Sequence, residues 1–225
     1  MFIVLEGLDG AGKSTQIKLL TAMLVERGME VEYLHFPRFD APVYGDMIAR
    51  FLRGEFGTAE QVNPYLVALL YAGDRADAAA MINGWREQGK CVIVDRYVLS
   101  NIGYQCAKVS GEEARKELRE WILDVEFNKF AIPRPDVSLF LDVPFEFTKK
   151  KLSEVREGDD REYLKGGKDI HEASLDLQLC VRESYLQYAK EYGDLKIVDC
   201  CDDNGNMADA QTIFGRIEKE LSPYL

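Results

Sequence analysis

Residues 7–15 read Gly7-Leu8-Asp9-Gly10-Ala11-Gly12-Lys13-Ser14-Thr15, which fits the pattern G-x-x-x-x-G-K-[ST]. The apolar run Phe2-Ile3-Val4-Leu5 stands before this stretch, and apolar residues at helical spacing follow it from Gln16 to Leu24. These flanks predict a strand, a glycine-rich loop and a helix, in that order. The sequence therefore predicts a P-loop that binds a nucleoside triphosphate, rather than a chance match in a glycine-rich turn.

Each part of this loop has a predicted role. Backbone N–H groups of residues 7–15 are expected to surround phosphate oxygens, and the helix N-terminus adds partial positive charge. Lys13 is expected to neutralise β- and γ-phosphate oxygens, while the Ser14 hydroxyl ligates Mg²⁺.

Length and composition predict one α/β domain over residues 1–225, with 47% hydrophobic residues for a core. The net charge of −11 argues against broad contact with nucleic acid, but it allows small phosphorylated ligands. Five cysteines without C-x-x-C spacing indicate neither a disulfide framework nor a zinc site. Without a run of about 20 apolar residues or a signal sequence, we expect a cytoplasmic protein that does not enter a membrane.

Two further strand ends carry candidate site residues. The sequence Phe36-Pro37-Arg38 ends a predicted strand over 31–36, so Arg38 could meet an anionic substrate group or be a solvated surface arginine. Asp95 ends the apolar run 91–94, where its carboxylate could hold Mg²⁺, take a proton, or cap the next helix. The helical stretch after it brings more polar groups to this edge, namely Ser100, Tyr104 and Gln105.

A long helix is predicted over 64–87, and it holds Tyr71 and Arg75 four residues apart on one face. The pair could stack on a base and hydrogen-bond to it, or it could be a packed ring beside a surface ion pair.

The charged, glycine-bearing segment 156–168 is predicted to be a loop between two helices. It could be a lid that closes over phosphates or a solvated connection. After it, Asp169 and Glu172 have the spacing of a capping box for a helix that runs through Tyr192.

Apolar runs over 137–142 and 195–199 complete a set of five predicted strands alternating with helices. The predicted fold is a three-layer α/β/α arrangement of the P-loop NTPase type, with a five-stranded parallel sheet and a short lid.

Taken together, the chain resembles the thymidylate kinases, a family of P-loop nucleoside-monophosphate kinases. The resemblance rests on the P-loop stretch, Phe36-Pro37-Arg38, Tyr71-Ala72-Gly73-Asp74-Arg75, Asp95-Arg96-Tyr97 with Ser100, and Arg134-Pro135-Asp136. It implies transfer of the γ-phosphoryl group of ATP to dTMP, giving dTDP, in a homodimer.

The resemblance also implies residue roles. Asp9 would contact the sugar 3′-hydroxyl, and Arg96, with Arg38, would hold the dTMP phosphate. Tyr71 would stack on thymine, while Arg75 and Gln105 read the polar edge of the base. Asp95 would organise the magnesium-bound phosphates. Phe36, Ser100 and Tyr104 complete the predicted substrate site.

Gly10 stands where some family members carry an arginine, so another cation must approach the transferred group. The candidate lid offers Arg156 and Arg161 for this catalytic role, beside Lys13, Asp95 and Arg96. Two other functions remain open at this stage. One is a deoxynucleoside kinase on the same scaffold, and the other is a nucleotide-switch GTPase or ATPase. The absence of an N-K-x-D motif counts against a GTPase.

Overall fold

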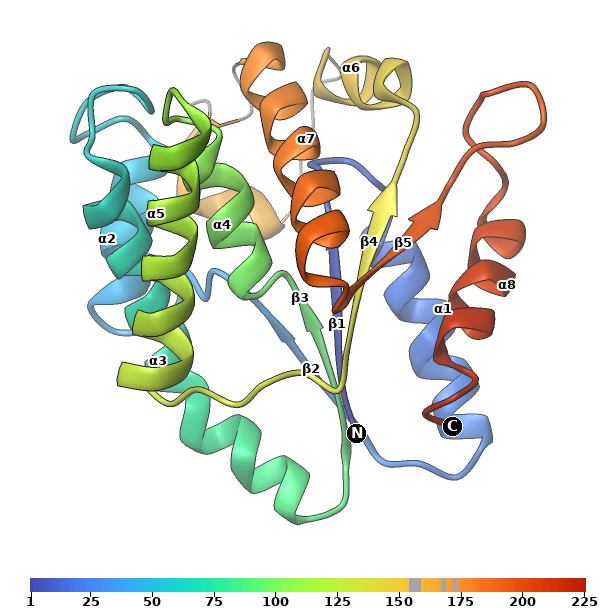
Figure 1. Cartoon of the computed structure of the whole chain (residues 1–225). Coiled ribbons are helices and arrows are strands. Elements are labelled where there is room, and N and C mark those ends of the chain that lie inside the picture. The colour runs from blue at the N-terminus through green and yellow to red at the C-terminus, as the bar shows by residue number, and fades with distance from the viewer. Residues whose placement is uncertain (154–158, 167–168, 172–173) are drawn as a thin grey trace.

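One parallel sheet organises the chain (Figure 1), as the computed structural model describes it for residues 1–153, 159–166, 169–171 and 174–225. Its strand order is β2-β3-β1-β4-β5, so the strand that leads into the P-loop lies at the centre. The strands are β1 (Phe2–Gly7), β2 (Val31–His35), β3 (Cys91–Asp95), β4 (Val137–Asp142) and β5 (Leu195–Asp199). The predicted five-stranded parallel α/β fold is confirmed.

The register of the strands brings the chemical groups to one edge. Leu5 of β1 pairs with Asp95 of β3, and Gly7 of β1 pairs with Leu141 of β4. All residues of β1 and β3 are buried, as their continuous apolar runs predict for strands covered on both faces. The P-loop and Asp95 therefore leave the sheet side by side at its carboxyl edge.

Helices cover both faces of the sheet and make three layers (Figure 1). One face packs against α1 (Lys13–Glu26) and α8 (Ala210–Leu221). The other face packs against α3 (Pro64–Glu87), α4 (Val98–Cys106), α5 (Glu112–Leu123) and α7 (Leu175–Tyr192). Alternate residues of β1 serve the two cores, because successive strand side chains point to opposite faces.

Two shorter helices, α2 (Tyr44–Leu52) and α6 (Phe145–Ser153), complete the α-helices that the described residues form. A π-helix over Asp124–Lys129 continues α5. None of the helices in the described part of the chain is long and apolar enough to cross a membrane.

The predicted capping box of α7 is wrong. The helix begins at Leu175, and the Ser174 hydroxyl caps it by accepting a hydrogen bond from the Leu177 N–H at 3.1 Å. The Asp169 carboxylate accepts instead from the His171 N–H and from the Tyr163 hydroxyl, both at 2.7 Å. Asp169 therefore shapes a turn before the helix rather than the first turn of the helix itself.

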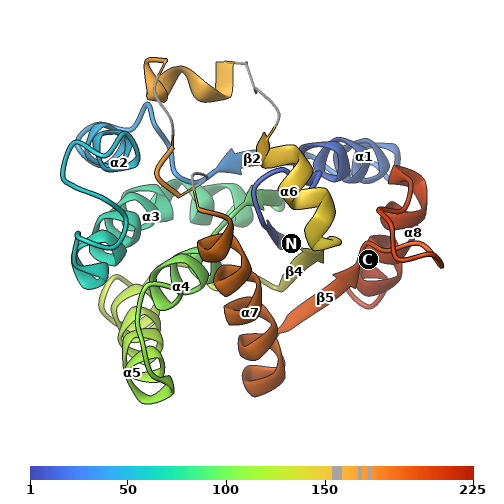
Figure 2. The same ribbon diagram turned by 90° about the horizontal axis from the view of Figure 1, so that it is seen from above.

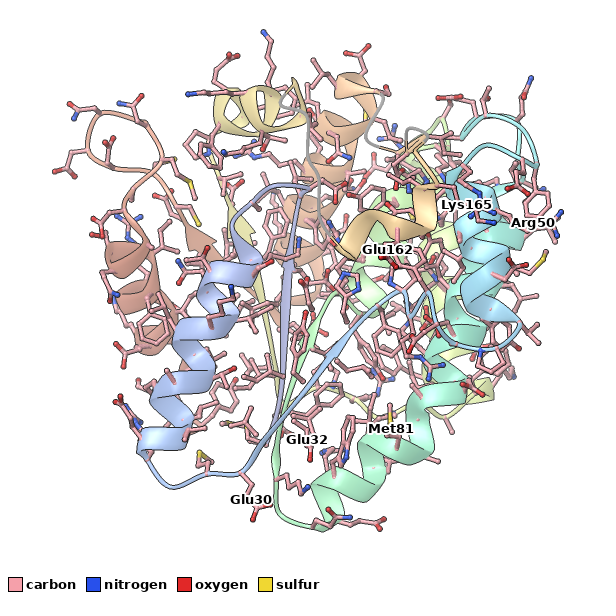
Figure 3. The ribbon with its side chains drawn as sticks, turned by 180° about the vertical axis from the view of Figure 1, so that it is seen from behind. Glu30, Glu32, Arg50, Met81, Glu162 and Lys165 are labelled. Carbon is pink, nitrogen blue, oxygen red and sulfur yellow. The ribbon has the colours of Figure 1, made fainter. Side chains whose placement is uncertain are left out.

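The candidate lid 156–168 is described only over residues 159–166, where Asp159–Leu164 form a 3₁₀-helix. Figure 2, which looks onto the carboxyl edge, shows this segment near α2 and α6 near the end of β4. Figure 3 shows Glu162 and Lys165 at the same end of the molecule as Arg50, with Glu30 at the opposite end. Arg156 and the side chain of Arg161 lie outside the described residues.

Candidate active site

A cavity of about 590 Å³ opens at the carboxyl edge of the sheet. Its wall begins at the P-loop, passes the ends of β2 and β3, and continues along α3 and α4 to Tyr163, Asp169 and His171. Of the predicted site residues, the following line it: Asp9, Gly10, Ala11, Gly12, Lys13, Ser14, Thr15, Phe36, Tyr71, Arg75, Asp95, Arg96, Ser100, Tyr104 and Gln105. Residues predicted from separate motifs are therefore brought together around one space.

Lys13 lies at the P-loop end of this cavity. Its Nζ donates to the carbonyl oxygens of Gly7 at 3.5 Å and Leu8 at 3.3 Å, behind the loop, and lies 3.8 Å from the Asp95 carboxylate. Burial lowers the pKa of Lys13, with a further lowering from Arg96, while Asp95 opposes the shift. Because its contacts with the two carbonyl oxygens and with Asp95 are all long, this buried ammonium is suited to bind an anionic ligand.

The glycines of the loop are needed for its backbone path. Gly10 and Gly12 have φ values of 77° and 82°, a region that residues with a Cβ rarely adopt. Gly12 is also the N-cap of α1, so the loop runs directly into the N-terminus of that helix. The loop thus presents backbone donors to the cavity, as phosphate binding requires.

Asp95 and Ser14 offer oxygen atoms at the same end. The Asp95 Oδ1 atom is buried and has no hydrogen-bond partner within the described part of the chain. Ser14 is exposed and lines the cavity with it. No group of three or more His, Cys, Asp or Glu residues that could hold a metal is found among the described residues. One carboxylate and one hydroxyl fit Mg²⁺, which takes few protein ligands and completes its shell with phosphates and water.

Arg96 lies beside the P-loop, in the wall between the two ends of the cavity. Its Nη2 donates to Asp9 Oδ1 at 2.7 Å and its Nη1 to Ser100 Oγ at 3.1 Å. Its φ is +66°, which is uncommon for a residue with a side chain and is found most often where the surroundings enforce it. The Arg96 N–H donates to the Leu5 carbonyl at 2.9 Å, which ties this backbone to the central strand.

Glu6, which the sequence analysis missed, fixes the residues after Arg96. Its carboxylate is fully buried and accepts from the N–H groups of Tyr97 at 2.9 Å and Ser100 at 3.2 Å. It also accepts from the hydroxyls of Ser100 at 2.6 Å and Tyr185 at 2.8 Å. Four donors thus converge on one carboxylate and hold the start of α4 against β1.

Asp9 is held from several sides. Besides Arg96, its carboxylate accepts from the Tyr104 hydroxyl at 2.6 Å and from Gln178 Nε2 at 3.1 Å. Gln178 belongs to α7, and its Nε2 also donates to the His171 carbonyl at 3.1 Å. The Asp9 carboxylate therefore joins the P-loop, α4 and α7 beside the cavity.

The far end of the cavity is formed by α3 and α4. The Arg75 guanidinium donates two hydrogen bonds to Glu126, at 2.5 Å and 2.7 Å, and both side chains are buried. Asn101 Nδ2 donates to Glu126 Oε1 at 2.9 Å and to the Ala68 carbonyl at 3.0 Å. Tyr71 and Gln105 line the cavity beside them. Polar groups and an aromatic ring thus meet at this end of the cavity.

Aromatic rings close the remaining side. Phe39 stacks on Tyr163 with ring centroids 3.8 Å apart, and Tyr104 stacks on His171 at 4.9 Å. Burial holds the pKa of His171 well below its usual range, and nearby Lys108 lowers it further. His171 is therefore a neutral ring in this wall near neutral pH.

Arg38 lies against α3, and its predicted contact with an anionic ligand stays a prediction. Its Nε donates to Asp74 Oδ1 at 2.8 Å and its Nη2 to Asp77 Oδ2 at 2.6 Å, both on α3. Its side chain does not belong to the wall of the cavity as the described residues form it. The two carboxylates hold the guanidinium against α3, so Arg38 ties the loop after β2 to that helix.

Sequence reasoning missed several residues that build this site: Glu6, Asn101, Glu126, Asp169, His171, Gln178 and Tyr185. Asn101 could have been found, because it lies on the same helix face as Gln105. Glu126 and Gln178 carry no local signal, since their partners lie 51 and 169 residues away along the chain.

The fold and this cavity define a P-loop nucleotide-binding protein with room for a second ligand beside the phosphate loop. The family model described as "Thymidylate kinase" matches residues 5–207. A probable thymidylate kinase from Thermococcus kodakarensis is 37% identical over 222 residues, covering 96% of this chain and 95% of that protein. The chain belongs to the thymidylate kinase family.

Two further comparisons agree. The thymidylate kinase of Mycobacterium tuberculosis is 38% identical over 146 residues, which cover 65% of this chain and 67% of that protein. The solved structure of a thymidylate kinase from Candida albicans aligns with a TM-score of 0.73 at 22% identity, covering 99% of this chain and 91% of that one. The structural likeness supports the same fold.

Proposed function

We propose that this cavity holds both substrates of a thymidylate kinase, with ATP at the P-loop end and dTMP at the end formed by α3 and α4. As a member of this family the chain is an ATP-dependent kinase that phosphorylates dTMP to dTDP. The observation that carries the proposal is the continuity of the wall from Lys13, past Arg96, to Arg75 and Gln105. Such a wall lets a donor and an acceptor phosphate meet in line.

At the donor end, Lys13 binds β- and γ-phosphate oxygens while backbone N–H groups of the P-loop surround them. The ammonium is buried, and its ion-pair distance to Asp95 is long, so a phosphate oxygen is a better partner than those it has. Ser14 and Asp95 would hold Mg²⁺, which when bound neutralises charge on the donor phosphates.

At the centre, Arg96 holds the acceptor phosphate. A guanidinium binds phosphate oxygens in a planar, bidentate way, and this one is set beside the P-loop by Asp9, Ser100 and its own backbone. Asp9 then has a double role, because it orients Arg96 and lies close enough to the cavity to meet a sugar hydroxyl. Charge that develops during transfer is stabilised by Lys13 and Arg96.

At the acceptor end, Tyr71 stacks on the base, and Arg75 and Gln105 meet its polar edge. Arg75 is already bound to Glu126 and lines the cavity, so it can act without first being desolvated. Gln105 is fully buried, and its Nε2 has no hydrogen-bond partner among the described residues. A buried donor of this kind is stabilised when a ligand accepts from it.

Three further assignments belong to this proposal. Arg156 and Arg161 supply a catalytic cation from the lid, since Gly10 leaves the P-loop without one. A homodimer is included because the chain belongs to the thymidylate kinase family. A cytoplasmic location is supported by the cysteines, all five of which are free thiols.

Rates of ADP release with different acceptors test this function against its alternatives. A thymidylate kinase releases ADP rapidly with dTMP and slowly with thymidine or no acceptor. A deoxynucleoside kinase would be faster with thymidine, and a nucleotide-switch ATPase would be equally fast without any acceptor. The Lys13→Ala variant serves as the control for contaminating activity.

A further inference from the structure

Lys108, which has no role in the site so far, contacts the amide of Gln105. Its Nζ lies 3.0 Å from Gln105 Oε1. A lysine ammonium has three donors and no acceptor, so the atom that it meets must be the amide oxygen. The amide nitrogen, Nε2, is thereby left without a partner among the residues described, in a wholly buried side chain that lines the cavity. While Lys108 is protonated, this contact therefore sets the orientation of the Gln105 amide.

Asn101 lies one helical turn before Gln105, on the same face of α4. Its Nδ2 donates to Glu126 and to the Ala68 carbonyl, and both of these groups can only accept. Its Oδ1 is consequently the unsatisfied atom, buried and without a partner in the described chain. Along the cavity wall, α4 thus presents an acceptor at Asn101 and a donor at Gln105.

This donor–acceptor pair complements one kind of pyrimidine edge. Thymine and uracil carry an N–H group flanked by carbonyl oxygens, whereas cytosine carries a ring nitrogen acceptor beside an amino donor. The edge of thymine or uracil offers its N–H to the Asn101 oxygen and a carbonyl to the Gln105 N–H, so both amides are satisfied. The edge of cytosine places an acceptor opposite the Asn101 oxygen and a donor opposite the Gln105 N–H, so neither amide gains a hydrogen bond. A buried polar site built for one pattern rejects the other strongly, because its groups would stay unpaired.

We propose that Lys108 is a positioning residue for acceptor specificity, which fixes the Gln105 amide so that the cavity selects a base with an imide edge over cytosine. This inference rests on the proposed function, since it needs the nucleobase to lie against α4. Lys108 does not line the cavity and acts through Gln105.

The surroundings hold Lys108 in this position. Its Nζ lies 5.0 Å from the centroid of the Phe51 ring, and the carboxylates of Glu60 and Asp169 attract it. Burial lowers the pKa of Lys108 to about 7 and is only partly offset by those carboxylates. Without the ammonium, the side-chain amide of Gln105 can rotate and present its oxygen to the amino group of cytosine.

The test is run at about pH 6, where Lys108 is mostly protonated. It compares equilibrium dissociation constants for dTMP and dCMP, measured by calorimetry, and kcat and KM for each acceptor. Lys108→Met keeps the apolar stem but removes the donor. We expect its preference for dTMP over dCMP to fall about tenfold or more, with KM for dTMP raised and kcat and KM for ATP nearly unchanged. Lys108→Arg retains a donor and is expected to keep the preference.

Two more variants make the test decisive. Lys116→Met removes an exposed lysine on α5 that pairs with Glu120, so it controls for the loss of one charge. Gln105→Glu places a carboxylate oxygen towards the cavity while still pairing with Lys108, and we expect it to weaken dTMP binding even where Lys108→Met folds poorly.

The inference is overturned if Lys108→Met and Gln105→Glu retain the wild-type preference, or if both nucleotides lose affinity by the same factor. Binding measurements separate this failure from that of the proposed function. Selective dTMP binding without phosphoryl transfer would contradict the kinase assignment and leave the role of Lys108 supported. Transfer without any selectivity against dCMP would contradict the role of Lys108 alone.

Discussion

Replacing Glu6 by Gln changes a single charge at the centre of the network that holds Arg96. Oε1 of Glu6 accepts from two backbone N–H groups, and Oε2 accepts from the hydroxyls of Ser100 and Tyr185. A glutamine can keep the two backbone bonds through its oxygen. Its amide nitrogen then faces two hydroxyls that must turn round to accept, although Ser100 already accepts from Arg96.

The magnitude follows from these four bonds. A hydrogen bond to a charged group contributes about 1.5–3 kcal/mol and a neutral one about 0.5–1.5 kcal/mol. Relief of the buried charge offsets part of the loss. We therefore expect the Glu6→Gln variant to lose about 1–3 kcal/mol of unfolding free energy, which lowers Tm by roughly 2–12 °C in a domain of this size.

The functional effect is expected in the acceptor site. Because Glu6 fixes Tyr97 and Ser100, its loss relaxes the unusual backbone of Arg96 and the placement of its guanidinium. We expect KM for dTMP to rise about three- to tenfold with a smaller change in KM for ATP.

Thermal unfolding and steady-state kinetics measure both effects, and Tyr185→Phe is the matched variant. It removes one hydroxyl donor from Glu6 without changing charge, so it should show roughly half the stability loss. A Glu6→Gln variant with the Tm and the dTMP KM of the wild type would refute the view that this carboxylate organises the site.

Four further predictions test other parts of the account. Lys13→Ala is expected to lower kcat by about two orders of magnitude or more without lowering Tm, and turnover above about a tenth of wild type would contradict its role. Arg75→Ala leaves Glu126 buried without its cation, so it should lower the unfolding free energy measured with denaturant by about 3–5 kcal/mol. The double variant Arg75→Met/Glu126→Gln should lose less unfolding free energy. Equal losses in the two variants would argue against a coupled pair. Folding lowers the pKa of Lys108 from 10.5 to about 7, so between these pH values the unfolded chain binds more protons than the folded chain. The stability of the wild type relative to Lys108→Met should therefore rise with pH across this window. If the Tm values of the two proteins stay parallel from pH 7 to 10, the buried lysine with a lowered pKa is contradicted. If the lid supplies the catalytic cation, Arg156→Ala or Arg161→Ala should lower kcat by roughly two to three orders of magnitude with little change in Tm. If both single variants and the double variant turn over at near wild-type rates, Lys13 and Arg96 alone must stabilise the charge that develops during transfer.

Much of the fold could be predicted because its signals are local. The P-loop pattern lies between a buried strand and a helix, and α3 has the predicted bounds because Asn63 caps it and Pro64 suits its first position. Motifs at the ends of parallel strands converge in space, which is why Lys13 and Asp95 line one cavity as expected.

The rest of the site depends on which long side chains meet across the packed helices. Arg38 was a candidate for an anionic ligand, but Asp74 and Asp77 on α3 lie within its reach and hold it there. Glu126 gave no signal of its own, because it meets Arg75 only when the π-helix that follows α5 packs against α3. Sequence patterns specify elements and strand ends, but they do not specify partners for a flexible side chain.

The fate of the γ-phosphate of ATP tests the central claim most directly. With ATP labelled at the γ-phosphate, dTMP as acceptor and the 225-residue chain as enzyme, we predict that the label appears in the β-phosphate of dTDP, one equivalent for each ADP formed. Little label should appear as inorganic phosphate. Release of the label chiefly as inorganic phosphate, or its transfer to thymidine in preference to dTMP, would contradict a cavity that binds ATP and dTMP together.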